Sequence, residues 1–333
     1  MYENAINNRQ PRIDWQMLVA LAGLMVLGVL FIHSATTVGE ATAALPWFKQ
    51  TSFRQVVWYA VGLVAAFGIC LIDYHILARW SLVIYWGAIL MLVAVLIPGI
   101  GTTHGWGARR WIDLGPIQFQ PSEFAKLAYI LMMAHFISRP REELAMPAIF
   151  FKALAMMALP FLLIMKEPDL GSALMFLPVG LLMMFVAGVP TRYLTRLIGA
   201  VGLLILLLLV DILFAPPQWQ VKLEDYQRRR LLVYFGLEYP VSPNATEKER
   251  REVKLRQRND SYNIEQALIS VGSGGLTGKG WRQGTQNALG YLPRAVAHND
   301  FIFSVIAEES GFVGSVTVVA LYTVLLFTGM RIA

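Results

Sequence analysis

The sequence is short of the residues that build disulfides and metal sites. It contains one cysteine, Cys70, and five histidines in 333 residues. A single cysteine excludes an intramolecular disulfide and a cysteine-based metal site, and the scattered histidines do not match the usual spacing of a zinc site. Charged residues make up 15% of the chain, compared with about 25% in soluble domains. This deficit argues against a disordered chain and against an ordinary cytosolic enzyme.

Long apolar runs take the place of the missing charges. Apolar residues form 56% of the chain, and the mean hydropathy is +0.53. Runs of about 18–20 apolar residues recur, and each can cross a hydrocarbon core of about 30 Å. The sequence therefore predicts an all-α, polytopic transmembrane helical bundle. Its eight expected spans are residues 15–35, 56–72, 80–98, 122–138, 150–165, 170–188, 194–214 and 301–328.

Basic residues in the short loops predict the orientation of these spans. With the N-terminus in the cytoplasm, nine Lys and Arg side chains fall on cytoplasmic segments and five on outside segments, as the positive-inside rule favours. The first run is longer than a signal-peptide core, so we expect an uncleaved anchor helix. The net charge of +6 then belongs to loops beside a membrane, and no nucleic-acid partner is expected.

One segment has the composition of a water-facing region. Residues 215–300 hold 22 of the 50 charged residues, 13 of them basic and 9 acidic. Span counting places this segment outside the cell as one large extracytoplasmic loop. A basic excess beside a membrane favours anionic headgroups or phosphates. Its dense mixed-charge run, residues 247–258, predicts a solvated helix or a flexible excursion.

A glycine-rich string, residues 270–281, is the strongest local pattern. Five glycines surround Lys279 between residues 272 and 280. Glycine permits close backbone approach, and exposed amides beside a lysine could hold a phosphate. The string is not a P-loop, because Gly280 stands where that motif needs Ser or Thr. A phosphate cradle and a tightly folded surface loop therefore both stay open.

Asp300 stands where the large loop meets the last span. Partial burial there could raise the pKa of its carboxyl, which suits a general base. An aspartate just before an apolar run also fits a helix N-cap, and position alone favours that reading. Glu308 and Glu309 follow inside the span, where ionisable groups usually face a cavity or a partner.

Other polar residues fall on the same outer side of the predicted bundle. Glu123 and Lys126 are three positions apart, so they share a helix face just inside the membrane. They suit either a mutual ion pair or an anion-binding cavity. Asp169 is an outer carboxylate at a helix start, with an N-cap as the alternative. The further candidates for substrate contacts are Arg110, Gln120, Arg228 and Lys279.

Together these strings resemble the SEDS family (shape, elongation, division, sporulation), most closely its elongation branch. The matching strings lie at residues 110–115, 119–126, 167–171, 225–228, 272–281 and 300–309. They cover residues 100–315 in the family's order. The resemblance implies a single membrane-embedded domain over residues 1–333. The family has ten spans, so we expect this chain to lack the last two at its C-terminus.

The resemblance also implies an activity. The family polymerises the undecaprenyl-linked disaccharide lipid II into glycan strands, outside the cytoplasmic membrane, with a class B penicillin-binding protein as partner within the elongation machinery. Asp300 matches the family's essential aspartate, which moves it from a cap to the expected catalytic base. Glu123 and Lys126 match a polar pair. A divalent cation, Mg²⁺ or Mn²⁺, is a candidate for stabilising the leaving pyrophosphate, although no ligand spacing specifies a metal.

Three alternatives compete with this reading. A lipid flippase or transporter also needs intramembrane charges, but it would be expected to show inverted repeats, and none is visible. A non-catalytic scaffold would not need clustered carboxylates and cations. A division-type polymerase of the same family is the nearest alternative, and the motifs do not firmly separate the two branches.

Overall fold

The computed structural model describes residues 13–37, 46–102, 109–113, 115, 118–167, 169–214, 232–233, 236–239, 246–293 and 296–332. Arg228, expected to contact substrate, lies outside these residues. The chain divides into two compact units, which are described separately. Unit 1 combines Met1–Phe67 with Lys222–Ala333, and unit 2 is Gly68–Val221.

Within the described residues, seven helical segments are long and apolar enough to cross a membrane, which confirms the polytopic helical class. They are α2 (Trp15–Thr36), α4 (Thr51–Cys70), α5 (Tyr74–Leu96), α8 (Pro147–Lys166), the pair α9 (Leu170–Leu174) and α10 (Phe176–Ala187), α11 (Thr191–Phe214) and α15 (Ile302–Ile332). The expected span at 122–138 forms α6 (Pro121–Ile137). Its 17 residues measure about 25 Å at 1.5 Å per residue, which lies at the lower end of the length range of spanning helices.

A small antiparallel sheet precedes α6 in unit 2 and positions its first residues. Strands β1 (Gly101–Thr102), β2 (Trp111–Asp113) and β3 (Gln118–Phe119) pair in chain order, with Ile112 opposite both Gly101 and Phe119. Gln120 follows β3 as the residue that caps α6, and Pro121 occupies the first helical position, where its missing N–H costs nothing.

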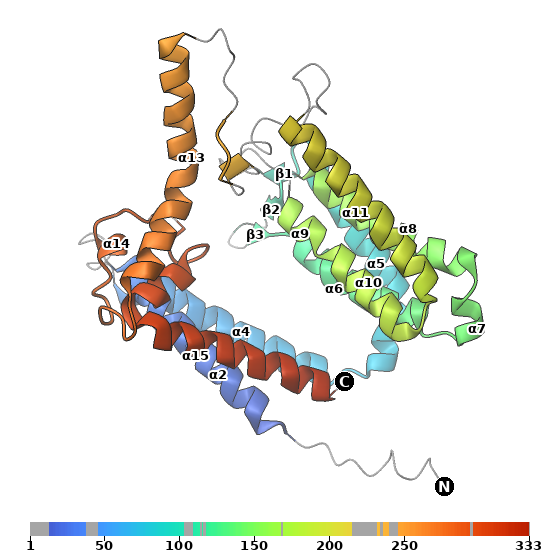
Figure 1. The fold of residues 1–333 in the computed structure, drawn as a ribbon. Helices are drawn as coiled ribbons and strands as arrows, with labels where there is room; N and C mark the ends of the chain where they lie inside the picture. Colours follow the sequence, from blue (N-terminus) through green and yellow to red (C-terminus); the bar gives the residue numbers. More distant parts are fainter. Residues whose placement is uncertain are drawn as a thin grey trace. The chain divides into compact units, whose positions relative to one another are not determined.

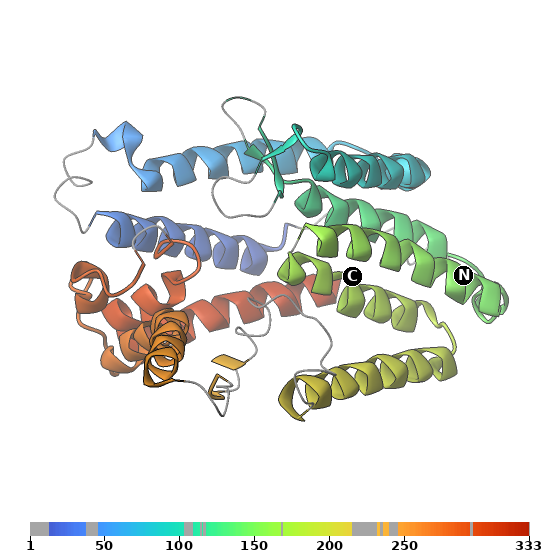
Figure 2. The ribbon, with the colours of Figure 1, turned by 90° about the horizontal axis from the view of Figure 1, so that it is seen from above.

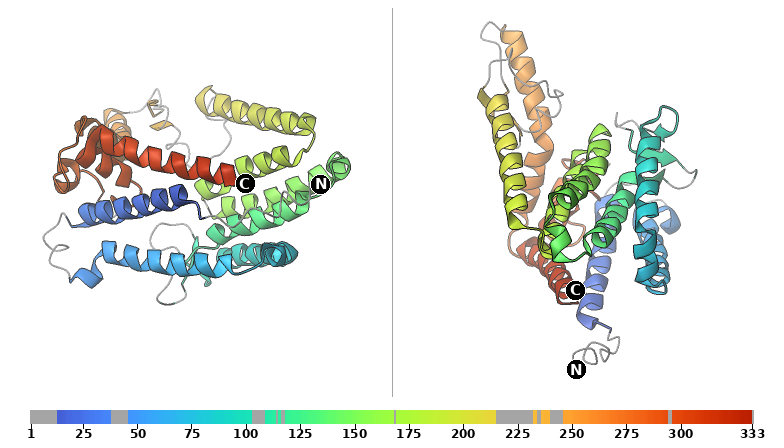
Figure 3. Two further views of the ribbon diagram at one scale, coloured as in Figure 1. Left: turned by 90° about the horizontal axis from the view of Figure 1, so that it is seen from below. Right: turned by 90° about the vertical axis from the view of Figure 1, so that its right-hand side faces the viewer.

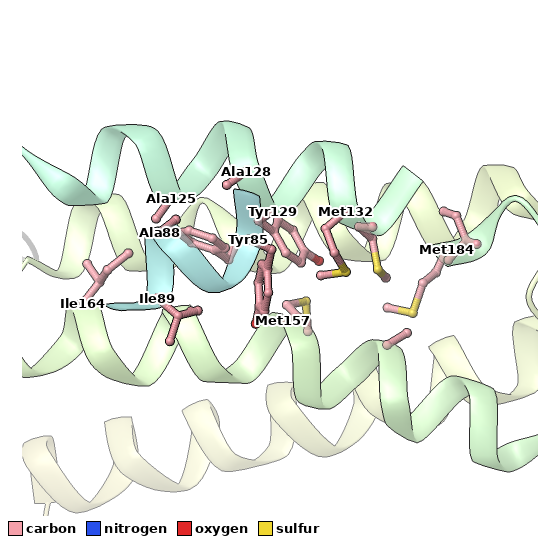
Figure 4. Close-up of a cluster of buried hydrophobic side chains, with 14 of the residues drawn as sticks. Tyr85, Ala88, Ile89, Ala125, Ala128, Tyr129, Met132, Met157, Ile164 and Met184 are labelled. Carbon is pink, nitrogen blue, oxygen red and sulfur yellow. The ribbon is translucent and has the colours of Figure 1, made fainter. Parts of the chain in front are cut away.

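The core of unit 2 lies between α5, α6, α8 and α10 (Figure 4). Tyr85 of α5 is buried and donates its hydroxyl to the carbonyl of Met156, 2.8 Å away. Gly180 lets α10 approach closely, because a Cβ atom there would lie 2.2 Å from the Tyr129 hydroxyl and 2.5 Å from the Met157 sulfur. Short α7 (Arg141–Leu144) precedes α8, and Figure 2 shows α11 at the margin of this unit.

Unit 1 is built on α2 and α15, which lie side by side (Figure 1). The other elements of this unit are η1 (Trp47–Lys49), α4, α13 (Glu247–Ser273) and α14 (Thr285–Ala288). Its buried apolar cluster joins α2, the segment before α15 and the first turns of α15. The members are Phe31, Ala35, Leu292, Ala297, Val305 and Ile306.

The mixed-charge run forms the exposed first half of α13, so the prediction of a solvated helix is confirmed. Thr246 begins it with a capping box, in which its hydroxyl accepts from the Glu249 amide and the Glu249 carboxylate accepts from the Thr246 amide. Figure 3 shows α13 extending well beyond the end of α15 that it contacts. The C-terminal end of α13 therefore delivers the glycine-rich string to α15.

Gly311 breaks α15 into two helical parts. Its backbone adopts φ 65° and ψ −159°, which is not helical. A side chain at this position would meet Gly278 N at 2.3 Å and Leu276 O at 2.6 Å. The last expected span therefore consists of a short N-terminal helix, 302–310, followed by a longer helix.

Candidate functional site

Asp300 lies in a turn, two residues before α15, and its side chain is exposed. Among the residues that the structure describes, its carboxylate accepts no hydrogen bond, so it does not cap α15 as position alone suggested. The neighbouring backbone is ordered by turns, in which the amides of Asn299 and Phe301 both donate to the carbonyl of Val296, at 3.0 and 3.5 Å. A carboxylate held this way is accessible to accept a proton.

His298 stands two residues before Asp300 and contrasts with it. Its Nδ1 atom is buried and has no hydrogen-bond partner within the described ranges. Burial lowers the pKa of the imidazole, because a cation there would lose its hydration. Burial therefore favours the uncharged imidazole, and Asp300 is the exposed acidic residue of this turn.

The glycine-rich string packs into the break of α15. Four backbone hydrogen bonds of 2.9–3.1 Å join the two segments. They run from the amides of Lys279, Gly280, Phe312 and Val313 to the carbonyls of Glu308, Glu309, Gly275 and Leu276, respectively. Two of the loop amides proposed to hold a phosphate are thus already bonded, and the tightly folded loop is the alternative that the structure favours.

Glu308 is fully buried beneath this loop, and four groups donate to its carboxylate. Lys279 Nζ lies 2.5 Å from Oε1, while the Thr285 hydroxyl and the Gln286 amide each lie 3.0 Å from the same oxygen. The Ser270 hydroxyl lies 3.2 Å from Oε2. These donors satisfy a charge that would otherwise be costly to bury.

Glu309 forms a second buried contact. Its Oε1 accepts from the Ser34 hydroxyl of α2 at 2.6 Å, and its Oε2 accepts from the Arg282 amide at 3.0 Å. The two glutamates therefore connect α2, the end of α13, the loop and α14 to the N-terminal part of α15. Sequence reasoning expected these charges to face a cavity or a partner, and the partners are now identified.

In unit 2, Glu123 and Lys126 form an ion pair on the first turns of α6. Lys126 Nζ lies 2.8 Å from Glu123 Oε1. The side chains are 27% exposed for Lys126 and 53% exposed for Glu123, so the pair is open to solvent or to a ligand. The ion pair is one of the two alternatives that the helical spacing left open. A role of these residues in substrate binding stays a prediction.

Asp169 and Gln120 come together at the start of α9. The Asp169 carboxylate caps α9 through the Ser172 amide at 3.1 Å and also accepts from the Ser172 hydroxyl at 2.9 Å. Gln120 Nε2 lies 3.4 Å from Asp169 Oδ2. Arg110 Nε donates to the backbone carbonyl of Glu167 at 3.1 Å. Three expected site residues, Arg110, Gln120 and Asp169, therefore meet at the α8–α9 turn.

Glu167 in this turn was not singled out from the sequence as a site residue. Its side chain is 1% exposed, and neither carboxylate oxygen has a hydrogen-bond partner in the described part of the chain. Burial, together with the carboxylate of Asp169, raises the pKa of Glu167 to about 8, although Arg110 acts in the opposite direction. The only sequence signal was a carboxylate next to a proline between two apolar runs.

An apolar cavity of about 430 Å³ lies between α8, α10 and α11 in unit 2. Its lining residues are Leu154, Met157, Ala158, Phe161, Leu162, Leu177, Leu181, Leu197, Ile198, Val201, Gly202 and Ile205. The cavity lies along the middle of the spanning helices. A space of this kind can accept an apolar chain but offers nothing to a charged headgroup.

Comparison with protein families gives one match along nearly the whole chain. The family model for FtsW, RodA and SpoVE, described as a cell cycle protein, matches residues 15–333. The chain is 35% identical to the peptidoglycan glycosyltransferase MrdB of Escherichia coli K12, covering 96% of this chain and 76% of that protein. It is 31% identical to the peptidoglycan glycosyltransferase RodA of Treponema pallidum, covering 93% and 79%. It is 30% identical to the probable peptidoglycan glycosyltransferase FtsW of Geobacter metallireducens, covering 97% and 77%.

Among the solved structures that are similar to this fold are the following two. One comes from work on the structural coordination of polymerisation and crosslinking by a peptidoglycan synthase complex. It has a TM-score of 0.63 and 28% identity, covering 96% of this chain and 77% of that chain. The other is the rod-shape-determining protein RodA of Thermus thermophilus, with a TM-score of 0.56 and 25% identity over 96% of this chain and 74% of that chain.

Proposed function

The chain belongs to the SEDS family of FtsW, RodA and SpoVE, which are multi-pass membrane proteins, and we propose that it is a peptidoglycan glycosyltransferase. Its substrate would be lipid II, and its products a glycan strand and undecaprenyl pyrophosphate. The observation that carries the chemistry is the exposed carboxylate of Asp300 at the turn before α15. The names of the relatives support the reaction class.

Asp300 would act as the general base. Its carboxylate would take the proton of the 4-hydroxyl of the GlcNAc unit of lipid II. The hydroxyl oxygen would then form a bond to the anomeric carbon of the lipid-linked MurNAc at the end of the growing strand. The bond from that carbon to the phosphate oxygen would break, and its electron pair would leave with the pyrophosphate. The configuration at the anomeric carbon would invert, which gives a β-1,4 linkage.

The departing pyrophosphate needs positive charge close to it. Lys126 is the best candidate of unit 2, because it is partly exposed and already paired with a carboxylate that a phosphate could replace. Arg110 stands at the α8–α9 turn, where its side chain is half-buried. Arg228 and Lys279 remain further candidates from the sequence.

The described residues contain no cluster of side chains that could hold a divalent cation. In the ranges that the structure describes, no group of three or more His, Cys, Asp and Glu side chains lies close enough to hold a metal ion. A divalent cation near the leaving pyrophosphate stays a prediction from the sequence. No step of the proposed mechanism depends on it.

The membrane setting fits a lipid-linked substrate. The N-terminus would be cytoplasmic, as the loop charges predict, and Asp300 would then lie at the outer face. The apolar cavity between α8, α10 and α11 would suit part of a polyprenyl chain, because its lining is apolar throughout.

Within the family, we favour the elongation role. MrdB of Escherichia coli is 35% identical over 324 residues, while the FtsW relative named above is 30% identical over the same length. This difference is small, and a division role is the competing assignment. The partner would be a class B penicillin-binding protein, because a similar structure comes from a peptidoglycan synthase complex.

The test is polymerisation of labelled lipid II by the purified chain in lipid nanodiscs, with its penicillin-binding partner present. The wild type is expected to give a ladder of glycan strands, whereas Asp300→Ala and Asp300→Asn give none. Glu252→Gln, which removes an exposed carboxylate from α13, serves as a matched control and should keep the ladder. The same samples should contain equal amounts of folded protein.

Two results would contradict the proposal. A ladder of normal intensity from Asp300→Asn would remove Asp300 from the chemistry. Absence of strands from every sample, with lipid II crossing the bilayer of liposomes that contain the chain, would instead establish the transporter alternative.

A further inference from the structure

The break in α15 leaves backbone groups without their helical hydrogen-bond partners. A helix interrupted inside a membrane loses backbone hydrogen bonds on both sides of the break, and each unsatisfied group costs several kcal/mol in lipid. At Gly311 the carbonyls before the break and the amides after it are satisfied by the loop 274–280, through the four backbone bonds described above. The loop thus completes the helix.

The loop can fit the break only because glycines bring its backbone next to that of α15. A Cβ atom at Gly274 would lie 1.9 Å from the carbonyl oxygen of Ala307. One at Gly278, whose φ is +80°, would lie 2.1 Å from the carbonyl oxygen of Glu309. Backbone contact of this closeness leaves no room for side chains, so specific side-chain contacts must come from the edge of the loop.

Those contacts converge on the buried carboxylate of Glu308. Lys279 leaves the loop and places its ammonium group 2.5 Å from Glu308 Oε1 and 2.6 Å from the Thr285 hydroxyl. The Glu308 side chain is 0% exposed, whereas that of Lys279 is 26% exposed. Glu308 therefore cannot touch a substrate, and the charge of Lys279 is directed inward.

A continuous set of contacts leads from Glu308 to the turn that carries Asp300. The Gln286 amide donates to Glu308, and the Gln286 carbonyl accepts from the amides of Tyr291 and Leu292 at 3.0 and 3.4 Å. Leu292 is fully buried in the cluster that also holds Ala297 of the Asp300 turn. On the other side, the helical residues 302–310 join Glu308 to the same turn directly.

From this arrangement we propose that Glu308 and Lys279 form a positioning pair, which fixes the glycine-rich loop in the break of α15 and thereby sets the position of the Asp300 turn. The proposal rests on the function proposed above and gives Lys279 a different role from the predicted substrate contact. Loss of one partner leaves the other charge uncompensated, so the loop shifts and Asp300 moves from its productive position.

The kinetic test separates positioning from substrate binding. In the lipid II assay, Lys279→Met and Glu308→Gln are expected to lower kcat by about tenfold to a hundredfold, as misplacement of a catalytic group does, with KM for lipid II changed less than about twofold. Lys279→Arg, which keeps the cation, should recover most of the activity. Lys248→Met, an exposed lysine on α13, is the control. A large rise in KM with kcat unchanged in Lys279→Met would overturn the proposal in favour of direct substrate binding.

The double variant adds a second criterion. If the two residues act only through each other, Lys279→Met combined with Glu308→Gln should lose no more activity than the worse single variant. Multiplied losses would mean that each residue acts on its own, and the positioning pair would be wrong.

Hydrogen exchange tests the pair without any activity. Amide exchange of residues 276–284 and 296–304 is expected to be faster in Lys279→Met and Glu308→Gln than in the wild type, and close to wild type in Lys279→Arg. Unchanged exchange in both variants would overturn the proposal. A wild type that makes no glycan strands would contradict the proposed function instead, and the exchange result would still decide whether the pair holds the loop and the turn.

Discussion

Gly278 faces the carbonyl oxygen of Glu309 so closely that a Cβ atom on Gly278 would stand 2.1 Å from it. The two residues are 31 positions apart in the sequence, and no side chain separates them. The loop and the broken helix therefore meet through their backbones. No space remains at this point for a side chain, so the loop position requires glycine.

Replacing Gly278 by alanine should therefore destabilise unit 1. The φ of +80° alone costs an L-residue about 1–2 kcal/mol, and the clash with backbone atoms adds to this, so we expect a loss above about 2 kcal/mol. The matched control is Gly272→Ala near the end of α13, where a Cβ atom would meet nothing within 4 Å. Thermal unfolding in nanodiscs measures both, and equal midpoints for the two variants would contradict the close contact.

The pH dependence of stability should reveal Glu167. Its pKa of about 8 in the folded state lies above the ordinary 4.5, so the folded state holds the proton more tightly. The stability linked to this group is complete below about pH 4.5 and is lost as the pH rises through about 8. We expect the thermal midpoint to fall over this range in the wild type, and to fall less in Glu167→Gln. Glu142→Gln, an exposed carboxylate on α7, should leave the slope unchanged.

The ion pair of α6 should matter more to activity than to stability. A partly exposed pair contributes about 0–1 kcal/mol, so Lys126→Met should fold normally while its turnover falls by about a hundredfold, if Lys126 meets the leaving phosphate. The exchanged pair, Glu123→Lys with Lys126→Glu, keeps the contact between opposite charges but moves the cation by one helical turn. Normal turnover in that double variant would show that the pair itself, and not the position of Lys126, is what the reaction needs.

Filling the apolar cavity should weaken the binding of a lipid-linked substrate. Gly202 lines this cavity, and a Cβ atom there meets nothing within 4 Å, so Gly202→Leu places a side chain in it without a backbone clash. We expect KM for lipid II to rise severalfold with folding unchanged. Gly199→Leu, on the same helix at an equally open position outside the lining, is the control, and equal KM values in both variants would remove the cavity from substrate binding.

The spanning helices were predictable from the sequence because each one coincides with a long apolar run. Their boundaries were less so. The second and third helices begin at Thr51 and Tyr74, several residues before the apolar runs. Asp73 explains the second shift, because its carboxylate accepts from the His75 amide and starts α5 early.

Some contacts of the candidate site could be expected from the sequence, whereas others could not. Local spacing offered the Glu123–Lys126 ion pair and the cap formed by Asp169 as alternatives, and the structure contains both. Local spacing could not reveal that Lys279 contacts Glu308, because these residues lie on segments 29 positions apart. Nor could it reveal that the Glu167 carboxylate is buried with no hydrogen-bond partner among the described residues, because this depends on the depth of a turn. The role of the glycines was likewise open, since a glycine-rich string shows that backbone comes close to something but not to what.

The hydrogen bond between Ser34 and Glu309 has a consequence for how the chain is made. The two residues are 275 positions apart, and unit 2 is synthesised between them. At about 5–20 residues per second, a ribosome needs roughly 15–55 s to reach Glu309 after Ser34 has been added. The first membrane helix must therefore spend that time in the bilayer without its final neighbour, while the intervening helices are inserted. Closure of unit 1 is a late event in biosynthesis, and a chain that stops before α15 leaves the Ser34 hydroxyl without the Glu309 carboxylate that accepts its hydrogen bond.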